Sequence, residues 1–479
     1  MRTSALLSCL LLLGAAPPAA TSVLSPDEQL KAIIQPVSGT MMHATVERLV
    51  SFGTRHTMSS QVDPKRGIGA ALTWSEGEFR RFSRACFGCL TVTRASEMVS
   101  GKRIPSPTRV TDVIAIQRGI LRPNDVVIIT GHIDSRVTDV TNSDEFEPGA
   151  NDDGSGSAAV IEAARVLSKQ RFPGTIVYAL LSGEEQGLYG GKILANYAAK
   201  SGWNVLANFN NDIVGNSCSS DGLCDDAHVR VFSEGPRWQG GDQLRPLVRS
   251  QGGENDAPSR NISRWLDDLA DRLAIGLDVR QVWRSDRLGR GGDHLEFLTA
   301  GFPAVRLSVA VENYDWQHQD VRVENGKQYG DTIDHMDFAY LEKVTKLNVA
   351  ALAAFASAPP PPAPSVQGAV STDTTLDWEA VPGAASYIVR WRRTDGSGWT
   401  AKLAAKPRCD VIPLGVKENR ARTETPPADL KCQQVLEGYR VDDWVFGVSS
   451  VGANGFEGPV ASAVPGGAFR PWIKPAATK

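Results

Sequence analysis

Residues 125–135 read "DVVIITGHIDS", an unbroken apolar run that ends in a histidine and an aspartate. A continuous run of this kind is typical of a strand buried on both faces of a sheet. A similar run, "TIVYALL" at 175–181, follows "SGSAAVIEAARVLSKQ" at 155–170, whose apolar residues share one helical face. Strand, helix and strand in this order predict an α/β fold with a mostly parallel central sheet flanked by helices.

Further strand candidates lie on both sides of this unit, and all of them are short and largely apolar. They are "DVIAI" (112–116), "NVLANF" (204–209), "HVRVFS" (228–233) and "PAVRLSV" (303–309). Residues 337–356 repeat apolar side chains at helical spacing, and we expect them to form the closing helix of this domain. The proline-rich stretch 358–365 is typical of a semi-rigid linker. The α/β domain is therefore predicted to cover residues 21–357.

Residues 366–479 have a different pattern. Apolar and polar residues alternate in "SYIVRWR" at 386–392 and again in "DDWVFGV" at 442–448, which precedes an Asn-Gly turn. This alternation predicts a C-terminal all-β sandwich, and its aromatic strands resemble those of a fibronectin type III domain. The segment from Cys409 to Cys432 is longer than that fold needs, and we interpret it as an insertion.

The N-terminus predicts export. Arg2 precedes a short apolar run, "ALLSCLLLLGAA", and small residues and prolines follow it. This order is typical of a secretory signal peptide over residues 1–20, and the run is too short for a stable membrane anchor. The alternative is a buried first helix. We expect a periplasmic or extracellular protein with no membrane segment after the signal is removed.

The cysteines predict disulfides. Of seven cysteines, Cys9 lies in the signal segment, and the other six fall into three near-neighbour pairs: Cys86 and Cys89, Cys218 and Cys224, and Cys409 and Cys432. An even number in an exported chain favours disulfides, and local pairing is the simplest connectivity. The alternative is a zinc knot built on "CFGC" at 86–89, but the spacing of "CSSDGLC" at 218–224 does not suit it.

Polar residues follow several predicted strands at the point where each one ends. His132 and Asp134 follow the first run, Glu184 and Glu185 the second, and Asp212 the strand after that. Asp152 and Asp153 lie in "GANDDGSGSA" at 149–158, before the first long helix. The carboxyl ends of parallel strands meet at one edge of a sheet, where ligands bind. Taken singly, Asp134 fits a turn, and either Asp152 or Asp153 fits a helix cap.

This donor set has a histidine and several carboxylates but no thiol, which suits a cation such as zinc held by nitrogen and oxygen. Two cations bridged by one carboxylate are compatible with this number of acids. The motifs "GHIDS", "GANDDGSGSA", "LSGEEQGLYGG", "NFNNDIVG" and "GGDHLEFLTAGFPAVRL" occur in one order. That order resembles the zinc-dependent exopeptidases typified by secreted bacterial leucyl aminopeptidases, with glutamate carboxypeptidase and glutaminyl cyclases as distant relatives. The resemblance covers residues 40–356.

The resemblance implies a di-zinc aminopeptidase fold and five ligands for two zinc ions: His132, Asp152, Glu185, Asp212 and His318. His132 and Asp212 would hold one ion, Glu185 and His318 the other, and Asp152 would bridge them. Glu184 would be the general base. Asp134 would fix the ring of His132 in its ligating tautomer.

The last histidine is the least determined ligand. His318 lies upstream of "DTIDHMDFAYL", which matches the segment after the family's last ligand, but the separation from Asp331 is longer than we expect. His335 is the alternative, and we expect it in the solvated first turn of the closing helix. We interpret His294 as a pocket wall or a residue behind the ligands. The remaining histidines, His43, His56 and His228, are predicted to be ordinary helix, loop and strand residues.

The leading hypothesis is a secreted di-zinc aminopeptidase that acts on peptides, with Glu184 and Asp212 available for the substrate's ammonium group. Arg287 and Arg290 are predicted either to contact a substrate carbonyl or carboxylate or to be solvated. The alternatives are a carboxypeptidase of the same fold, a glutaminyl cyclase, which needs one zinc, and a non-catalytic receptor-like relative. A net charge of −3 argues against a nucleic-acid partner. The all-β domain is the candidate for binding a cell-surface or protein partner.

Overall fold

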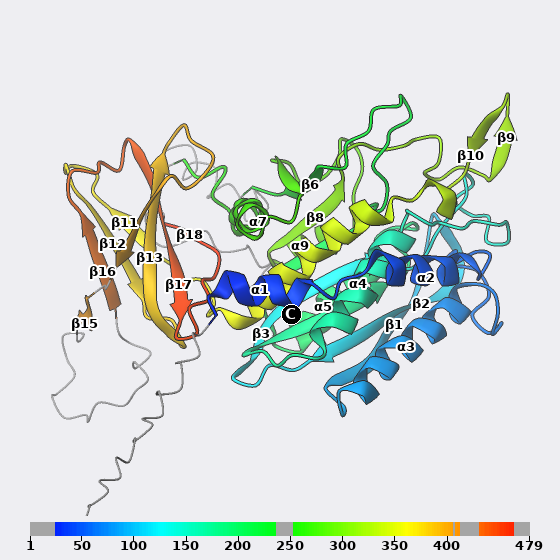
Figure 1. Ribbon diagram of the computed structural model, residues 1–479, viewed down its shortest axis with the longest axis horizontal. Coiled ribbons are helices and arrows are strands. Elements are labelled where there is room, and N and C mark those ends of the chain that lie inside the picture. The colour runs from blue at the N-terminus through cyan, green and yellow to red at the C-terminus, as the bar shows by residue number, and fades with distance from the viewer. Residues whose placement is uncertain (1–23, 236–251, 406–407, 412–430, 464–479) are drawn as a thin grey trace, which may run out of the picture.

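The computed structural model describes residues 24–235, 252–405, 408–411 and 431–463. An α/β domain comes first, and a domain of two β-sheets lies at its side (Figure 1). The predicted signal peptide and most of the predicted insertion between Cys409 and Cys432 lie outside the described residues. Among the helices described, none is long and apolar enough to cross a membrane.

The central sheet has eight strands in the order β1-β2-β4-β3-β5-β8-β6-β7. Their bounds are β1 Leu90–Gly101, β2 Ile104–Gln117, β3 Arg122–His132, β4 Gly174–Leu181, β5 Asn204–Asn211, β6 His228–Ser233, β7 Asp278–Val282 and β8 Ala304–Val309. The four central strands β4, β3, β5 and β8 are parallel, and so are β6 and β7. The predicted α/β fold is confirmed. Because His132 is level with Leu181, the segments that follow β3 and β4 emerge at the same edge.

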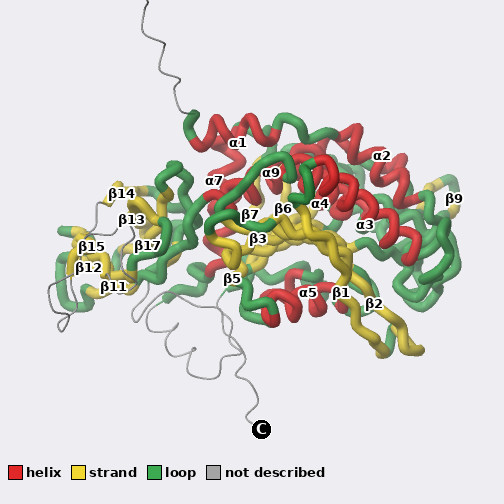
Figure 2. Tube along the Cα trace, turned by 90° about the horizontal axis from the view of Figure 1, so that it is seen from below, coloured by secondary structure: helices red, strands yellow, loops and turns green. Residues whose placement is uncertain are grey.

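Helices cover both faces of this sheet (Figure 2). One face carries α1 Pro26–Ile34, α2 Gly39–Val50, α3 Ile68–Ala85, α4 Gly154–Leu167, α7 Pro258–Leu273 and α9 Phe338–Ser357, and their apolar side chains form the main core. The other face carries α5 Tyr189–Lys200 and α8 His294–Thr299. The closing helix is confirmed as α9, which begins after Asp337, whose side chain accepts a hydrogen bond from the backbone of Tyr340.

The end of β3 and the start of α4 approach each other very closely. A Cβ added at Gly131 would lie 2.5 Å from the backbone of Gly156, which is nearer than real Cβ contacts come. Glycine is therefore required at this crossing. The close approach brings the loop before α4, which carries Asp152 and Asp153, next to His132.

The C-terminal domain is a sandwich of two four-stranded antiparallel sheets, in the orders β11-β12-β16-β15 and β14-β13-β17-β18. The strands are β11 Ser365–Gln367, β12 Thr374–Glu379, β13 Ala384–Arg393, β14 Ala401–Ala405, β15 Arg408–Val411, β16 Lys431–Leu436, β17 Trp444–Gly452 and β18 Ala461–Ser462. Trp378 of one sheet and Val389 and Phe446 of the other share a core. The all-β sandwich is confirmed, and its likeness to fibronectin type III stays a prediction.

All three local cysteine pairs are disulfides, as predicted: Cys86–Cys89, Cys218–Cys224 and Cys409–Cys432. The zinc knot on the first pair is therefore wrong, because its two thiols are bonded to each other.

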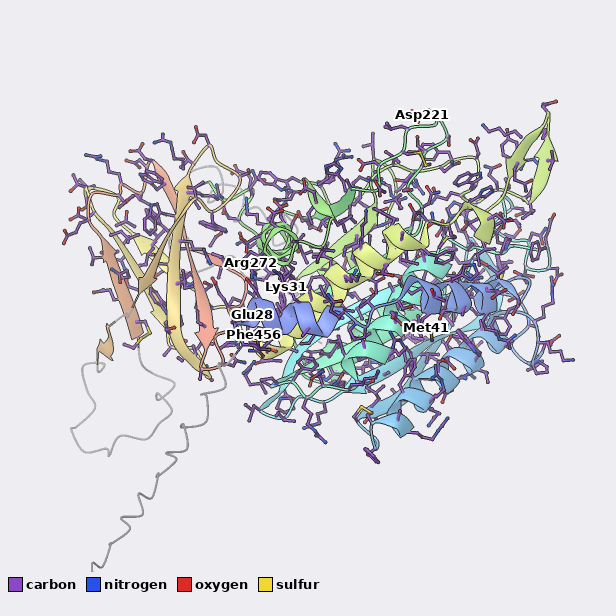
Figure 3. The ribbon with its side chains drawn as sticks, viewed as in Figure 1. Glu28, Lys31, Met41, Asp221, Arg272 and Phe456 are labelled. Atoms are coloured by element: carbon purple, nitrogen blue, oxygen red, sulfur yellow. A yellow bond between two sulfur atoms is a disulfide. The ribbon has the colours of Figure 1, made fainter. Side chains whose placement is uncertain are left out.

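The sandwich is fastened to the α/β domain by buried contacts. Arg392 of β13 pairs with Asp256, just before α7, at 2.6 Å, with side-chain exposures of 3% and 5%. Asp256 also accepts a hydrogen bond from Ser462. Phe456, which follows β17, lies in the main core of the α/β domain and close to α1 and α7 (Figure 3). The two domains therefore share part of one core.

We predict that Asp256→Ala lowers the free energy of unfolding by about 3–5 kcal/mol, because it leaves Arg392 buried without a counter-charge. Asp268→Ala, which breaks an exposed pair with Arg272, is the control and should cost less than about 1 kcal/mol. Urea unfolding followed by tryptophan fluorescence measures both. Equal midpoints for the two variants would contradict an energetically important interface.

Candidate metal centre

Five side chains from separate parts of the chain meet at the carboxyl edge of the sheet. They come from the end of β3, the loop before α4, the turn after β4, the residue after β5 and the loop after β8: His132, Asp152, Glu185, Asp212 and His318. They form two groups, His132 with Asp152 and Asp212, and Asp152 with Glu185 and His318. In each group the potential ligand atoms all lie within 4.8 Å of one another. Asp152 belongs to both groups.

Asp152 turns one carboxylate oxygen to each histidine. Its Oδ1 lies 3.2 Å from Nε2 of His132, and its Oδ2 lies 2.9 Å from Nε2 of His318. Asp212 Oδ1 lies 3.9 Å from the same nitrogen of His132, and Glu185 Oε1 lies 2.9 Å from that of His318. Converging nitrogen and carboxylate atoms of this kind fit a divalent cation such as zinc in each group.

Asp134 contacts His132 through a different atom from the one we expected. Nδ1 of His132 donates to the backbone carbonyl of Asp134 at 3.0 Å, while the nearer carboxylate oxygen is 3.7 Å away. This bond leaves Nε2 facing Asp152. The Asp134 carboxylate instead accepts from the hydroxyl of Thr57 and from the backbone N–H groups of Glu184 and Glu185, at 2.9, 3.3 and 3.3 Å. Asp134 therefore holds the histidine and the glutamate turn together.

The adjacent glutamates have different surroundings. Both carboxylate oxygens of Glu185 are engaged, one by His318 and the other by Nε of Arg136 at 2.9 Å. In the described part of the chain, the Glu184 carboxylate makes no hydrogen bond or ion pair. Burial, with nearby negative charges including Asp212 adding to it, raises the pKa of Glu184 well above its ordinary value. The two adjacent glutamates therefore differ in their partners, which only Glu185 has among the described side chains.

Negative charge dominates the electrostatics of the first group. Burial alone would lower the pKa of His132, but Asp153, Asp134 and Asp152 raise it well above the ordinary value. Burial would raise the pKa of Asp152, but His318 and His132 hold it well below the usual range. The centre therefore concentrates acids, which a bound cation would offset.

Buried residues that the sequence did not single out hold the loops of the centre. Arg55 donates to the carbonyls of Ile133, Pro148 and Gly149 at 2.7, 2.6 and 2.8 Å. The Asp331 carboxylate accepts from the backbone of Asp152 at 2.7 Å, and burial raises its pKa to about 7. Arg55 lies in "GTRHT" at 53–57 and Asp331 begins "DTIDH" at 331–335, but no local signal in either segment shows the partners.

Asp153 caps a helix, which is one of the two roles that its sequence position allows. Its carboxylate accepts from the backbone of Gly156 in the first turn of α4 and from the backbone of His132, both at 2.9 Å. Arg306 is a further residue that sequence reasoning missed. It is fully buried in β8 and pairs with Asp212 at 2.8 Å and Asp286 at 3.0 Å. An arginine inside the apolar run "PAVRLSV" was the available signal.

The other histidines lie outside the two groups. His335 stacks on Trp316, with ring centroids 3.9 Å apart and planes 2° apart, and it is half-buried. The expectation of a solvated helical turn is therefore wrong, because the ring is covered by an aromatic partner. His294 is buried with Nε2 2.7 Å from the carbonyl of Ser285. The remaining three lie in α2, a loop and β6: His43, His56 and His228.

Arg287 and Arg290 are paired with an acid. They contact the carboxylate of Glu312 at 3.0 and 2.7 Å, and Arg230 shares that carboxylate. Burial would raise the pKa of Glu312, but the three arginines lower it to about 2. Neither residue is a freely solvated charge, so that alternative is wrong. A contact with substrate stays a prediction.

The fold and the centre together define an α/β protein with a carboxylate-linked pair of candidate metal positions. The chain belongs to Peptidase family M28, whose model matches residues 112–352, a span that includes both groups. It is 39% identical to a probable zinc metalloprotease of Leptosphaeria maculans over 92% of this chain and 98% of that protein. It is 40% identical to another from Pyrenophora teres f. teres, over 92% and 88%.

Solved structures show the same fold. The LapA aminopeptidase of Legionella pneumophila superposes with a TM-score of 0.51, at 19% identity, over 73% of this chain and 80% of that one. The predicted resemblance to zinc peptidases is thus confirmed at the level of the family.

We predict that His318→Ala lowers the metal content of the protein, while His335→Ala leaves it unchanged. The reason is that Nε2 of His318 faces two carboxylates, whereas His335 stacks on Trp316. Inductively coupled plasma mass spectrometry on dialysed protein measures the content. Loss of metal from the His335 variant alone would reverse the assignment.

Proposed function

We propose that this chain is an exported aminopeptidase that uses two zinc ions to hydrolyse the N-terminal peptide bond of peptides. The observation that carries the proposal is the Asp152 carboxylate, whose two oxygens face two separate ligand groups while Glu184 stands unpaired beside them. Membership in a peptidase family supports hydrolysis of peptide bonds. The name of the curated relatives, probable zinc metalloprotease, supports zinc as the metal.

The proposed ligands follow from the two groups. His132 and Asp212 would hold the first zinc ion, Glu185 and His318 the second, and Asp152 would join them. Zinc supplies Lewis-acid chemistry, because it lowers the pKa of a water molecule to about 7 and polarises a carbonyl group.

Glu184 is proposed to be the general base. Its carboxylate is not engaged by another side chain, and its backbone N–H donates to Asp134, which fixes the turn against His132. It would take a proton from the attacking water and pass it to the amine that leaves. A carboxyl with a raised pKa is suited to holding that proton for part of the cycle.

Acidic side chains near the proposed ligands support recognition of a substrate ammonium group. Acids surround His132, and Glu184 and Asp212 are the proposed partners of the free N-terminus. Arg287 and Arg290, the arginines considered for contact with a substrate carboxylate, already pair with Glu312. A carboxypeptidase of the same fold is therefore the less favoured alternative.

The cellular setting is also part of the proposal. A signal peptide at residues 1–20 would export the chain to the periplasm or the medium, where the three disulfides are stable. Peptides are the proposed partners of the centre, without nucleic acid. The C-terminal sandwich, proposed to be of the fibronectin type III kind, is the candidate for a cell-surface or protein partner.

We predict that Glu184→Gln lowers kcat by roughly 10²–10⁴-fold, the usual contribution of general acid–base catalysis, and leaves the metal content unchanged. Glu185→Gln is the matched variant one residue away, and it should lose metal because its carboxylate faces His318. Steady-state kinetics and metal analysis on the same preparations measure both effects. Loss of metal from the Glu184 variant would contradict its role as a base.

A comparison of free and N-acetylated peptides tests the aminopeptidase proposal. Acetylation removes the ammonium charge that the acids of the centre are proposed to bind, so the acetylated peptide should not be cleaved. Chromatography of the products, with the C-terminal amide of the same peptide as the control, shows which end is recognised. Cleavage of the acetylated peptide but not of the amide would favour the carboxypeptidase instead.

A further inference from the structure

Arg136 lies against two of the residues that we propose as ligands of the second zinc ion. Its Nε donates to Oε2 of Glu185 at 2.9 Å, and its Nη2 lies 2.6 Å from Nδ1 of His318. A third contact, from Nη1 to the carbonyl of Val137 at 3.1 Å, fixes the guanidinium. The side chain is only 14% exposed, so solvent screens its charge weakly.

The contacts with Glu185 and His318 both use the atom of the side chain that is not turned to the other residues of the second group. Glu185 turns its other oxygen, Oε1, to Nε2 of His318, and Arg136 occupies Oε2. Glu185 therefore has one oxygen to offer a cation rather than two. Nδ1 of His318, the nitrogen that faces away from Asp152, faces the guanidinium instead. Arg136 thus engages both ligands that belong to the second group alone.

The first metal position has a different charge balance. Arg306 contacts its ligand Asp212, but it divides its charge with Asp286 at 3.0 Å. Asp153 and Asp134 add negative charge around His132. Among the residues that the structure describes, Glu185 is the one carboxylate that pairs with Arg136. The positive charge of Arg136 beside the second position is therefore less fully offset than that of Arg306 beside the first position.

The backbone segments that carry Glu185 and His318 are held by contacts that do not involve Arg136. The backbone carbonyl of Glu185 accepts from Arg103 at 2.7 Å, and its N–H donates to Asp134. The carbonyl of His318 accepts from the hydroxyl of Thr138 at 3.2 Å. Removal of the guanidinium should therefore leave the ligands in position and take away a charge that repels a cation.

We propose that Arg136 is a built-in counter-ion that weakens metal binding at the second position and leaves the first position unaffected. The inference rests on the proposed two-zinc function. Arg136 acts on metal occupancy through Glu185 and His318.

The test is a zinc titration of the metal-free full-length protein against a competing indicator, with stoichiometry from mass spectrometry. The variants are Arg136→Met, which removes the charge, and Arg136→Lys, which keeps it. We expect Arg136→Met to tighten the second binding step at least about tenfold, because a nearby positive charge that repels the zinc ion is lost. The first step should not change, and Arg136→Lys should resemble the wild type. Arg94→Met, which breaks an exposed pair with Glu76, is the control.

Two results would overturn the inference. An unchanged second step in Arg136→Met would show that the guanidinium does not oppose the metal, and a weaker step would show that it orients the ligands instead. A tightened second step in Arg136→Lys equal to that in Arg136→Met would show that charge is not the cause. Failure of the two-zinc proposal is distinct, because the wild type and both variants would then bind a single ion. Circular dichroism of each metal-free variant confirms that it is folded.

Discussion

The structure depends on the crowding of carboxylates at one edge of a largely apolar sheet. Buried charges of one sign are costly unless cations lie beside them. Arg306 and Arg136 supply part of that compensation, at Asp212 and Glu185. His132 and His318 turn Nε2 toward Asp152, and the proposed zinc ions would supply the remaining positive charge. The loops around the carboxylates are held in place for the same reason. Asp331 and Arg55 both hydrogen-bond to the backbone of the loop that carries Asp152.

Much of the fold and of the centre could be predicted from the sequence, for a physical reason. Strands buried on both faces leave continuous apolar runs, and parallel strands bring their carboxyl ends to one edge. His132, Glu185 and Asp212 follow such runs directly, so the sequence places them together. His318 needed the family resemblance, because its loop comes after β8 and has no strand signal of its own.

The residues that could not be predicted act across long separations. Arg306 meets Asp212, and Asp331 meets Asp152, through contacts between segments that are about ninety and one hundred and eighty residues apart. Nothing local marks such pairs. His335 was predicted wrongly for a different reason. Its local pattern suggests an exposed start of a helix, but Trp316 covers the ring. The buried pair between Arg392 and Asp256 is likewise invisible in two segments that read as separate domains.

Asp134 connects two parts of the centre that strands β3 and β4 deliver separately. Its carbonyl holds the ring of His132, and its carboxylate holds the backbone of Glu184 and Glu185. The length of one aspartate side chain therefore sets the spacing between His132 and Glu184, the proposed ligand and the proposed base. A glutamate at this position would keep every charge in the centre and still change that spacing. Residue 134 must therefore have the length of an aspartate as well as its charge.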